Sequence, residues 1–229
     1  RDNGAVPATI AIMNGKIKVG CNAQDLEILA NSKNVVKVSR RDFPIVIQNK
    51  SVGATTVAAT MIAASMAGIR VFATGGIGGV HRGWESSLDI SADLYELQNT
   101  SVAVVSAGAK AILDIPATLE VLESFGVPVI GFNSDTFGAF YSKSSGIALE
   151  MNMKTADEIA EFLHVKWGMG LQGGVLISNP IPSEFEISAE LIEPVVAAAV
   201  DEAKNLGING KRLTPFLLTK IKDVTAGKS

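Results

Sequence analysis

Lys110 is the residue whose type and position best suit a nucleophilic amine. It follows the apolar run Val104-Val105-Ser106 and a stretch of small residues, Ala-Gly-Ala at 107–109. In open α/β folds, ligands bind beyond the carboxyl ends of the strands. An amine held there among small apolar residues is partly desolvated, which favours its neutral, nucleophilic form. The alternative is a surface lysine at the start of a helix.

Two aspartates and a hydroxyl group precede this lysine in the chain. Asp89 and Asp93 are four residues apart with Ser91 between them, so both carboxylates share one face if the segment is helical. Hard oxygen ligands of this kind suit Mg²⁺, Mn²⁺ or a polyol. The alternative is an ordinary helix start, with one aspartate as the N-cap and acidic residues in the first turn.

Two further stretches are candidates for binding an anion. Gly-Ala-Thr-Thr-Val at 53–57 combines a glycine, two hydroxyl groups and the free N–H groups of an expected helix start, which together can hold a phosphate. Lys-Val-Ser-Arg-Arg-Asp at 37–42 contains three cations, enough for one anionic group and too few for a nucleic-acid groove. The alternatives are a common threonine-rich helix start and a solvated loop.

A glycine-rich run at 75–79 follows an expected strand, but its spacing is not G-x-G-x-x-G and no helix pattern follows directly. We therefore expect no NAD site there. His81 lies in the same loop, where it either stiffens the loop or contacts a substrate.

The elements that position these residues alternate along the chain. Short runs rich in valine and isoleucine recur between amphipathic stretches, which is typical of an α/β fold with a mainly parallel central sheet covered by helices. We expect strands at 8–13, 69–73, 102–106, 127–132 and 174–178. Helices are expected after Asn22, from near Ala54 to a stop at Gly68, and at 114–125, 155–168 and 188–206.

Composition sets limits on partners and location. The 229 residues are 47% hydrophobic and carry a net charge of −3, which fits one substantial core and provides no basic field for a nucleic acid. No apolar stretch approaches the roughly 20 residues of a membrane span. Cys21 is the only cysteine and cannot form an internal disulfide, so a soluble cytoplasmic protein is expected.

Eight segments together carry a family resemblance. They are Gly-Ala-Val-Pro-Ala-Thr-Ile at 4–10, the stretches 37–42, 53–57, 72–83 and 89–93, Ala-Gly-Ala-Lys at 107–110, Gly-Val-Pro-Val-Ile-Gly at 126–131, and Ser-Asn-Pro-Ile-Pro at 178–182. These segments span nearly the whole chain. Their residues and their order strongly resemble the indigoidine synthase A family of pseudouridine-5′-phosphate glycosidases. The resemblance implies a single-domain α/β/α sandwich.

The resemblance also implies a reaction: reversible cleavage of the C–C glycosidic bond of pseudouridine 5′-phosphate to uracil and ribose 5-phosphate, with one Mn²⁺ per subunit, in a homotrimer. The family's nucleophile, which forms a Schiff base with the ring-opened ribose, matches Lys110. Its metal-binding aspartate matches Asp89. Its substrate-binding positions match Lys37, Val57, Ser91, Ala92 and Asp93.

The resemblance further concerns the two ends of the chain. The family's proton donor is a glutamate in a Glu-Ser-Thr segment ahead of the stretch that here begins at Gly4, and Arg1 is the first residue of this sequence. The family also has a C-terminal segment containing an asparagine, which the resemblance places beyond Leu217, and we expect this sequence to lack it after Lys228. We therefore expect residues 1–229 to form one domain that is shorter than the family at both ends. The alternative function is a sugar-phosphate-binding homologue without catalysis.

Overall fold

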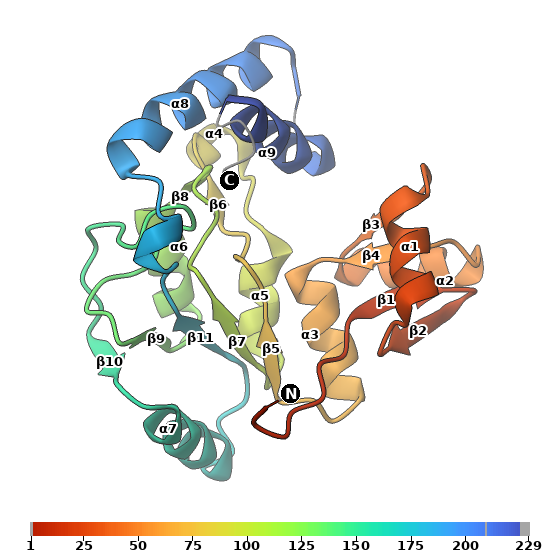
Figure 1. The fold of residues 1–229 in the computed structure, drawn as a ribbon, viewed down its shortest axis with the longest axis horizontal. Coiled ribbons are helices and arrows are strands. Elements are labelled where there is room, and N and C mark those ends of the chain that lie inside the picture. Colours follow the sequence, from red (N-terminus) through yellow and green to blue (C-terminus); the bar gives the residue numbers. More distant parts are fainter. Residues whose placement is uncertain (1, 209, 225–229) are drawn as a thin grey trace.

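The computed structural model describes residues 2–208 and 210–224, and its central element is a five-stranded parallel sheet (Figure 1). Its strands lie in the order β10-β9-β11-β7-β5. Their bounds are β5 (Val71–Ala73), β7 (Ala103–Ser106), β9 (Val129–Phe132), β10 (Met151–Met153) and β11 (Val175–Ser178). The expected α/β fold with a mainly parallel sheet is confirmed.

Helices cover both faces of this sheet, because successive strand residues point to opposite sides. One face, with Val104 and Leu176, shares an apolar cluster with α3, α5 and α6. The other face, with Ile130 and Ile177, packs against α7. The bounds of these helices are α3 (Val57–Met66), α5 (Ala92–Asn99), α6 (Ile115–Ser124) and α7 (Ala156–Gly168).

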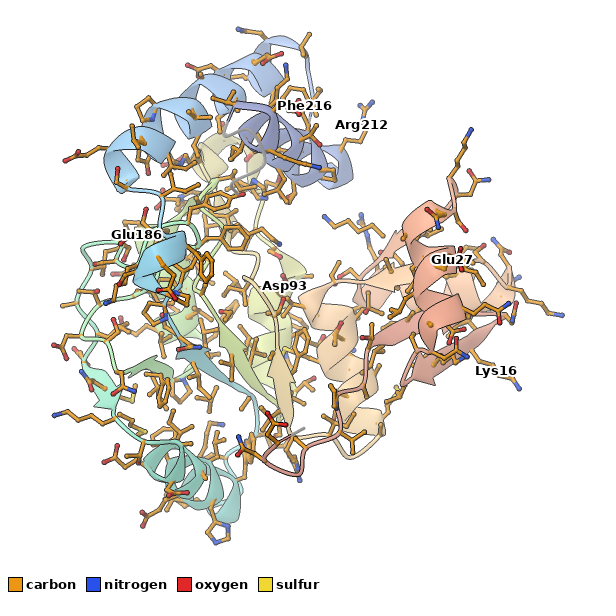
Figure 2. All side chains as sticks on the ribbon, viewed as in Figure 1. Lys16, Glu27, Asp93, Glu186, Arg212 and Phe216 are labelled. Atoms are coloured by element: carbon orange, nitrogen blue, oxygen red, sulfur yellow. The ribbon has the colours of Figure 1, made fainter. Side chains whose placement is uncertain are left out.

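The N-terminal part of the chain forms a second, smaller sheet with mixed strand directions. Its order is β2-β1-β4-β3, and β1 runs antiparallel to both of its neighbours. The strands are β1 (Ile10–Met13), β2 (Lys16–Val19), β3 (Val36–Val38) and β4 (Gly53–Thr55), and α1 (Ala23–Asn31) and α2 (Phe43–Gln48) accompany them. Ile12, Val38 and Val46 form a separate core beneath this sheet. Figure 2 shows Lys16 and Glu27 pointing outward from this part, whereas Asp93 lies in the interior.

The expected strand at 8–13 is therefore present, but its placement in the parallel sheet is wrong. Asn14 and Gly15 have φ angles of 51° and 73°, which are the left-handed values that a two-residue hairpin turn requires. This turn sends the chain back antiparallel as β2. The Asn-Gly pair is the local signal that predicts such a hairpin.

Several helix ends follow the local sequence as predicted. The N-caps of α1, α6 and α7 are Asn22, Asp114 and Thr155, each accepting a hydrogen bond through its side chain from a backbone N–H of the first turn. Ser188 precedes α8 (Ala189–Asn205). An additional helix, α9 (Leu213–Val224), packs against α8 and is joined to it by the ion pair Lys220–Glu202.

The remaining elements are short. They are α4 (Trp84–Ser87), the antiparallel pair β6 (Val80–His81) and β8 (Leu113–Asp114), and 3₁₀ turns at Arg40–Asp42, Ser183–Phe185 and Gly210–Arg212. Among the described residues, no helix combines the length and the apolar character that crossing a bilayer requires.

Candidate active site

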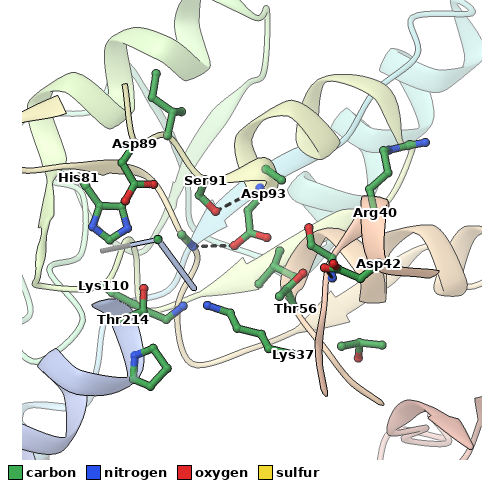
Figure 3. Close-up of a pocket in the computed structure, with 18 of the residues that line it drawn as sticks. Lys37, Arg40, Asp42, Thr56, His81, Asp89, Ser91, Asp93, Lys110 and Thr214 are labelled. Carbon is green, nitrogen blue, oxygen red and sulfur yellow. Dashed lines mark hydrogen bonds between the residues drawn. The ribbon is translucent and has the colours of Figure 1, made fainter. Parts of the chain in front are cut away.

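A cavity of about 790 Å³ lies between the small sheet, the start of α5, the loop after β7 and the beginning of α9. Figure 3 shows polar side chains gathered around it from segments far apart in the sequence. All seven residues to which the family resemblance assigns a role line this cavity: Lys37, Val57, Asp89, Ser91, Ala92, Asp93 and Lys110. The structure thus brings the candidate nucleophile, the carboxylates and the expected anion-binding positions to one place.

Lys110 lies in a loop beyond the carboxyl end of β7 and not at a helix start. Its backbone N–H donates to the carbonyl oxygen of Ile77 at 3.2 Å, and the Ile77 N–H donates to the carbonyl oxygen of Gly108 at 3.1 Å. Burial lowers the pKa of the Lys110 amine; the carboxylate of Asp93 opposes this shift and the charge of Lys37 adds to it. The amine is therefore more readily neutral than an exposed lysine.

The conformation of Gly108 is what allows the loop to reach Lys110. Its φ of +104° is unfavourable for residues with a side chain, and a Cβ there would lie 1.9 Å from the carbonyl oxygen of Gly138. Only glycine fits at this position without a shift of the backbone.

Asp89 and Asp93 do not lie on one helical face, so that expectation is wrong. Helix α5 begins at Ala92 with Ser91 as its N-cap, and Asp89 belongs to the preceding irregular segment. The local reason is that the Ser91 hydroxyl accepts a hydrogen bond from the Asp93 N–H, which fixes the helix start after Asp89. The two carboxylates consequently have different surroundings.

Asp93 is buried, and its carboxylate joins two other elements of the site. One oxygen accepts from the backbone N–H of Ala58 at 2.8 Å and the other from the N–H of Gly78 at 2.9 Å. Asp93 therefore connects the start of α3 to the glycine-rich loop. A carboxylate near a helix N-terminus also complements the positive end of the helix dipole.

Helix α3 begins later than expected, since Gly53–Thr55 form a strand and Thr56 is the N-cap. The Thr56 hydroxyl accepts a hydrogen bond from the N–H of Ala59 at 3.3 Å, and the Asp93 carboxylate accepts one from the N–H of Ala58. Val57 is the first residue of the helix and lines the cavity. Its backbone N–H has no protein partner among the described residues, so it is available to an anion.

The three cations at 37–42 have different positions. In Figure 3 the amines of Lys37 and Lys110 point toward each other across the cavity. Arg40 instead forms two hydrogen bonds of 2.8 Å to the carboxylate of Glu96, and Arg41 lies 4.0 Å from Asp42. Lys37, on β3, is thus the cation of this segment that faces the candidate nucleophile.

The glycine run packs tightly against protein atoms. A Cβ on Gly76 would lie 2.4 Å from the Phe140 ring, one on Gly78 2.2 Å from the Ser91 Oγ, and one on Gly79 2.4 Å from the Thr118 Oγ1. These glycines therefore permit close approach of the loop to its neighbours.

His81 lines the same cavity from strand β6. Burial lowers the pKa of its imidazole; the nearby Asp89 carboxylate opposes the shift, and the charges of Lys37 and Lys110 reinforce it. A neutral imidazole can accept or donate a hydrogen bond to a substrate. His81 lies in the cavity lining, and the choice between its two roles stays a prediction.

The part of the chain that the structure describes holds no cluster of three or more His, Cys, Asp or Glu side chains arranged for a metal ion. Asp89 nevertheless presents a carboxylate to the cavity. Mg²⁺ and Mn²⁺ can bind through one or two carboxylates, with water and substrate oxygens completing the coordination. The residues present fit a cation held in that way.

Two features of the cavity and its surroundings were not predicted from the sequence. Thr214, Pro215 and Leu218 come from α9, whose approach to the cavity depends on tertiary packing. Glu96, the partner of Arg40, is fully buried and lies 56 residues away along the chain. An isolated glutamate on a helix carries no local signal of such a pairing.

The parallel sheet, with a partly buried amine beyond its strand ends and a free helix N–H in the same cavity, defines an α/β protein with a polar cavity at the strand ends. The chain belongs to the family described as indigoidine synthase A like protein, which matches residues 1–229.

Curated relatives and solved structures agree with this assignment. The chain is 58% identical to a pseudouridine-5′-phosphate glycosidase of Caldanaerobacter subterraneus subsp. tengcongensis, over all of this chain and 75% of that relative. It is 56% identical to a pseudouridine-5′-phosphate glycosidase of Glaesserella parasuis, over all of this chain and 76% of that relative. It is also similar to the crystal structure of the prealnumycin C-glycosynthase AlnA in complex with ribulose 5-phosphate, with a TM-score of 0.92, 38% identity and coverage of 100% of this chain and 75% of the other. An indigoidine synthase A-like protein from Thermotoga maritima matches with a TM-score of 0.88 and 35% identity, over 96% of this chain and 72% of the other.

Proposed function

We propose that this protein reversibly cleaves the C–C glycosidic bond of pseudouridine 5′-phosphate to give uracil and ribose 5-phosphate. The observation that carries the proposal is the partly buried Lys110 amine, facing Lys37 in a cavity that also contains the Val57 N–H and Asp89. The names of the relatives, and the sugar phosphate bound to the similar C-glycosynthase, support the same substrate class.

The chemistry begins at the sugar. The neutral Lys110 amine attacks the anomeric carbon, the bond from that carbon to the ring oxygen breaks, and the oxygen takes up the proton that the nitrogen loses. The nitrogen lone pair then forms the imine as the bond to uracil breaks. The electron pair of that bond passes to C5 of the base, which takes a proton from water, and the protonated imine nitrogen returns a proton to the solvent. Water hydrolyses the imine, releasing ribose 5-phosphate and regenerating the amine.

The rest of the cavity binds and orients the substrate in this proposal. Lys37 and the N–H of Val57 bind the phosphate, since a cation and a free helix N–H are both suited to an anion. Ser91 and Ala92 contact the substrate beside Asp89. Asp93 contacts the substrate as well, and its oxygens, which accept from the N–H groups of Ala58 and Gly78, hold this wall in place.

Asp89 is the residue that would hold a Mn²⁺ ion, with water and substrate oxygens as the other ligands. Such an ion supplies positive charge that orients the pyrimidine and stabilises the negative charge developing on it.

We also propose a cytoplasmic homotrimer. Large apolar side chains remain exposed on the single chain, among them Met66, Leu88 and Leu191 at 74%, 75% and 69%, and contacts between subunits would cover such residues. Light scattering coupled to size-exclusion chromatography measures the oligomeric mass, and a monomer would contradict this part of the proposal.

The test of the reaction uses the whole chain. Incubation with pseudouridine 5′-phosphate and Mn²⁺ should release uracil, and borohydride added to a mixture with ribose 5-phosphate should fix the sugar on Lys110, detected by peptide mass spectrometry. Lys110→Arg keeps the charge and is expected to give no adduct. A wild-type chain that neither releases uracil nor gains the adduct would contradict the enzyme. Binding of ribose 5-phosphate without either result would favour the non-catalytic sugar-phosphate-binding homologue.

A further inference from the structure

The ion pair between Arg40 and Glu96 lies at the edge of the cavity and joins two parts of the fold. Arg40 follows β3 in the small N-terminal sheet, and Glu96 belongs to α5 of the main body. The Arg40 Nε and Nη2 atoms each lie 2.8 Å from one oxygen of the Glu96 carboxylate. The pair therefore links the small sheet directly to the main body.

Stability alone does not account for this pair. The Glu96 side chain is 0% exposed, and Thr100 donates a further hydrogen bond to it. Burying a carboxylate is costly, and apolar residues of similar size are often as stabilising as a buried ion pair. A two-point contact between an arginine and a carboxylate also fixes the relative orientation of the two side chains and the distance between them.

The segments that the pair connects both carry site residues. Lys37 is three positions before Arg40, and Asp93 is three positions before Glu96. The chain from Lys37 to Arg40 has little freedom: Val38 is fully buried, its carbonyl accepts from the Thr56 N–H at 2.9 Å, and the Ser39 N–H donates to Asp42 at 2.9 Å. Lys37 and Arg40 therefore have a fixed position relative to one another.

Arg40 itself does not aim at the nucleophile. Figure 3 shows its guanidinium group directed away from the amines of Lys37 and Lys110. We infer that the Arg40–Glu96 pair is a positioning device, which holds Lys37 at the distance from Lys110 at which the phosphorylated sugar is bound. This inference rests on the proposed function, because it assigns the pair to the same sugar-phosphate site.

The test is a double-mutant cycle on the affinity for ribose 5-phosphate, measured by calorimetry. Arg40→Met should weaken binding about 10- to 100-fold, the effect of losing one charge-assisted hydrogen bond to the phosphate. Lys37→Met should do the same. If Arg40 acts through Lys37, adding Arg40→Met to Lys37→Met should change the affinity less than about 2-fold.

Two further variants separate positioning from folding. Arg40→Lys keeps the charge but not the two-point contact, and it should weaken binding while leaving thermal unfolding nearly unchanged. Lys18→Met breaks the Lys18–Asp25 pair, which lies within the small sheet and its α1 helix, and it should leave the affinity unchanged.

Independent effects of Arg40→Met and Lys37→Met would overturn the inference, as would an Arg40→Met chain that is folded and binds normally. The proposed function is checked separately by borohydride trapping at Lys110 in the wild type. If the wild type is trapped but the effects of Arg40→Met and Lys37→Met are independent, only the positioning role is rejected and the proposed function stands. A wild type that neither binds ribose 5-phosphate nor is trapped rejects both proposals.

Discussion

The backbone N–H of Lys110 donates a hydrogen bond of 3.2 Å to the carbonyl oxygen of Ile77. This bond joins the loop after β7 to the glycine-rich loop after β5, and the two loops continue side by side beyond the parallel sheet. The position of the amine therefore depends on how closely the glycine-rich loop packs against its other neighbours.

Replacing Gly78 by alanine should disturb this arrangement. A Cβ there would lie 2.2 Å from the Ser91 Oγ and 2.7 Å from the Asp93 Oδ2, so we expect a loss of about 1–3 kcal/mol in the free energy of unfolding and weaker binding of ribose 5-phosphate. Urea denaturation and calorimetry measure the two effects. Gly168→Ala is the matched control, because a Cβ on Gly168 meets no atom within 4 Å. Equal stability of the two variants would contradict the role of Gly78.

Asp93→Asn removes one of the two acceptors that hold the start of α3 and the glycine-rich loop. An amide offers a single acceptor oxygen, so the N–H of Ala58 or of Gly78 loses its partner. We expect a loss of about 1–3 kcal/mol in stability and slower imine formation at Lys110. Thermal unfolding and the rate of borohydride trapping report these effects. Normal values of both would show that Asp93 is not needed to organise the site.

The pH dependence of trapping should reflect the lowered pKa of Lys110. Burial disfavours the charged amine, and only the neutral amine attacks a carbonyl carbon. At saturating ribose 5-phosphate, the trapping rate should rise with pH and level off below the ordinary lysine value of 10.5. Mass spectrometry of the adduct against pH measures this. A midpoint at or above the ordinary value would contradict the desolvated environment.

The same burial should appear in the stability of Lys110→Met. Below the folded-state pKa the lysine is charged in both states, and only the folded state bears the cost of its burial. Between the folded-state pKa and 10.5, the unfolded chain binds more protons, so wild-type stability rises with pH. Lys110→Met should therefore be more stable than the wild type near neutral pH, and the difference should shrink as the pH approaches 10. Denaturation at several pH values tests this; a constant difference would contradict it.

Local signals predicted much of the fold. The N-cap of α7, Thr155, and the stop after α3 at Gly68 depend on residues within one or two turns. The five expected strands are present because each is a short apolar run. The sheet to which β1 belongs depends on its partners, and only the Asn-Gly pair at 14–15 indicated an antiparallel neighbour.

The site was predicted where a motif lies on one stretch of chain. Lys110 and Val57 follow from a strand end and a helix start, and the cavity contains both. The Arg40–Glu96 pair and the contribution of Thr214 arise only when distant segments pack together. Their residue types are ordinary surface types, so no local pattern distinguishes them.

The tightly packed glycines have a consequence for motion. Glycine samples more backbone conformations than other residues in an unfolded chain, so fixing the run at 75–79 costs more conformational entropy than fixing other residues. Once fixed, the run packs closely against the Phe140 ring, Ser91 and Thr118, and its Gly78 lines the cavity. We therefore expect exchange of a ligand with solvent to depend on lining residues outside this run, such as Thr214 and Leu218 of α9.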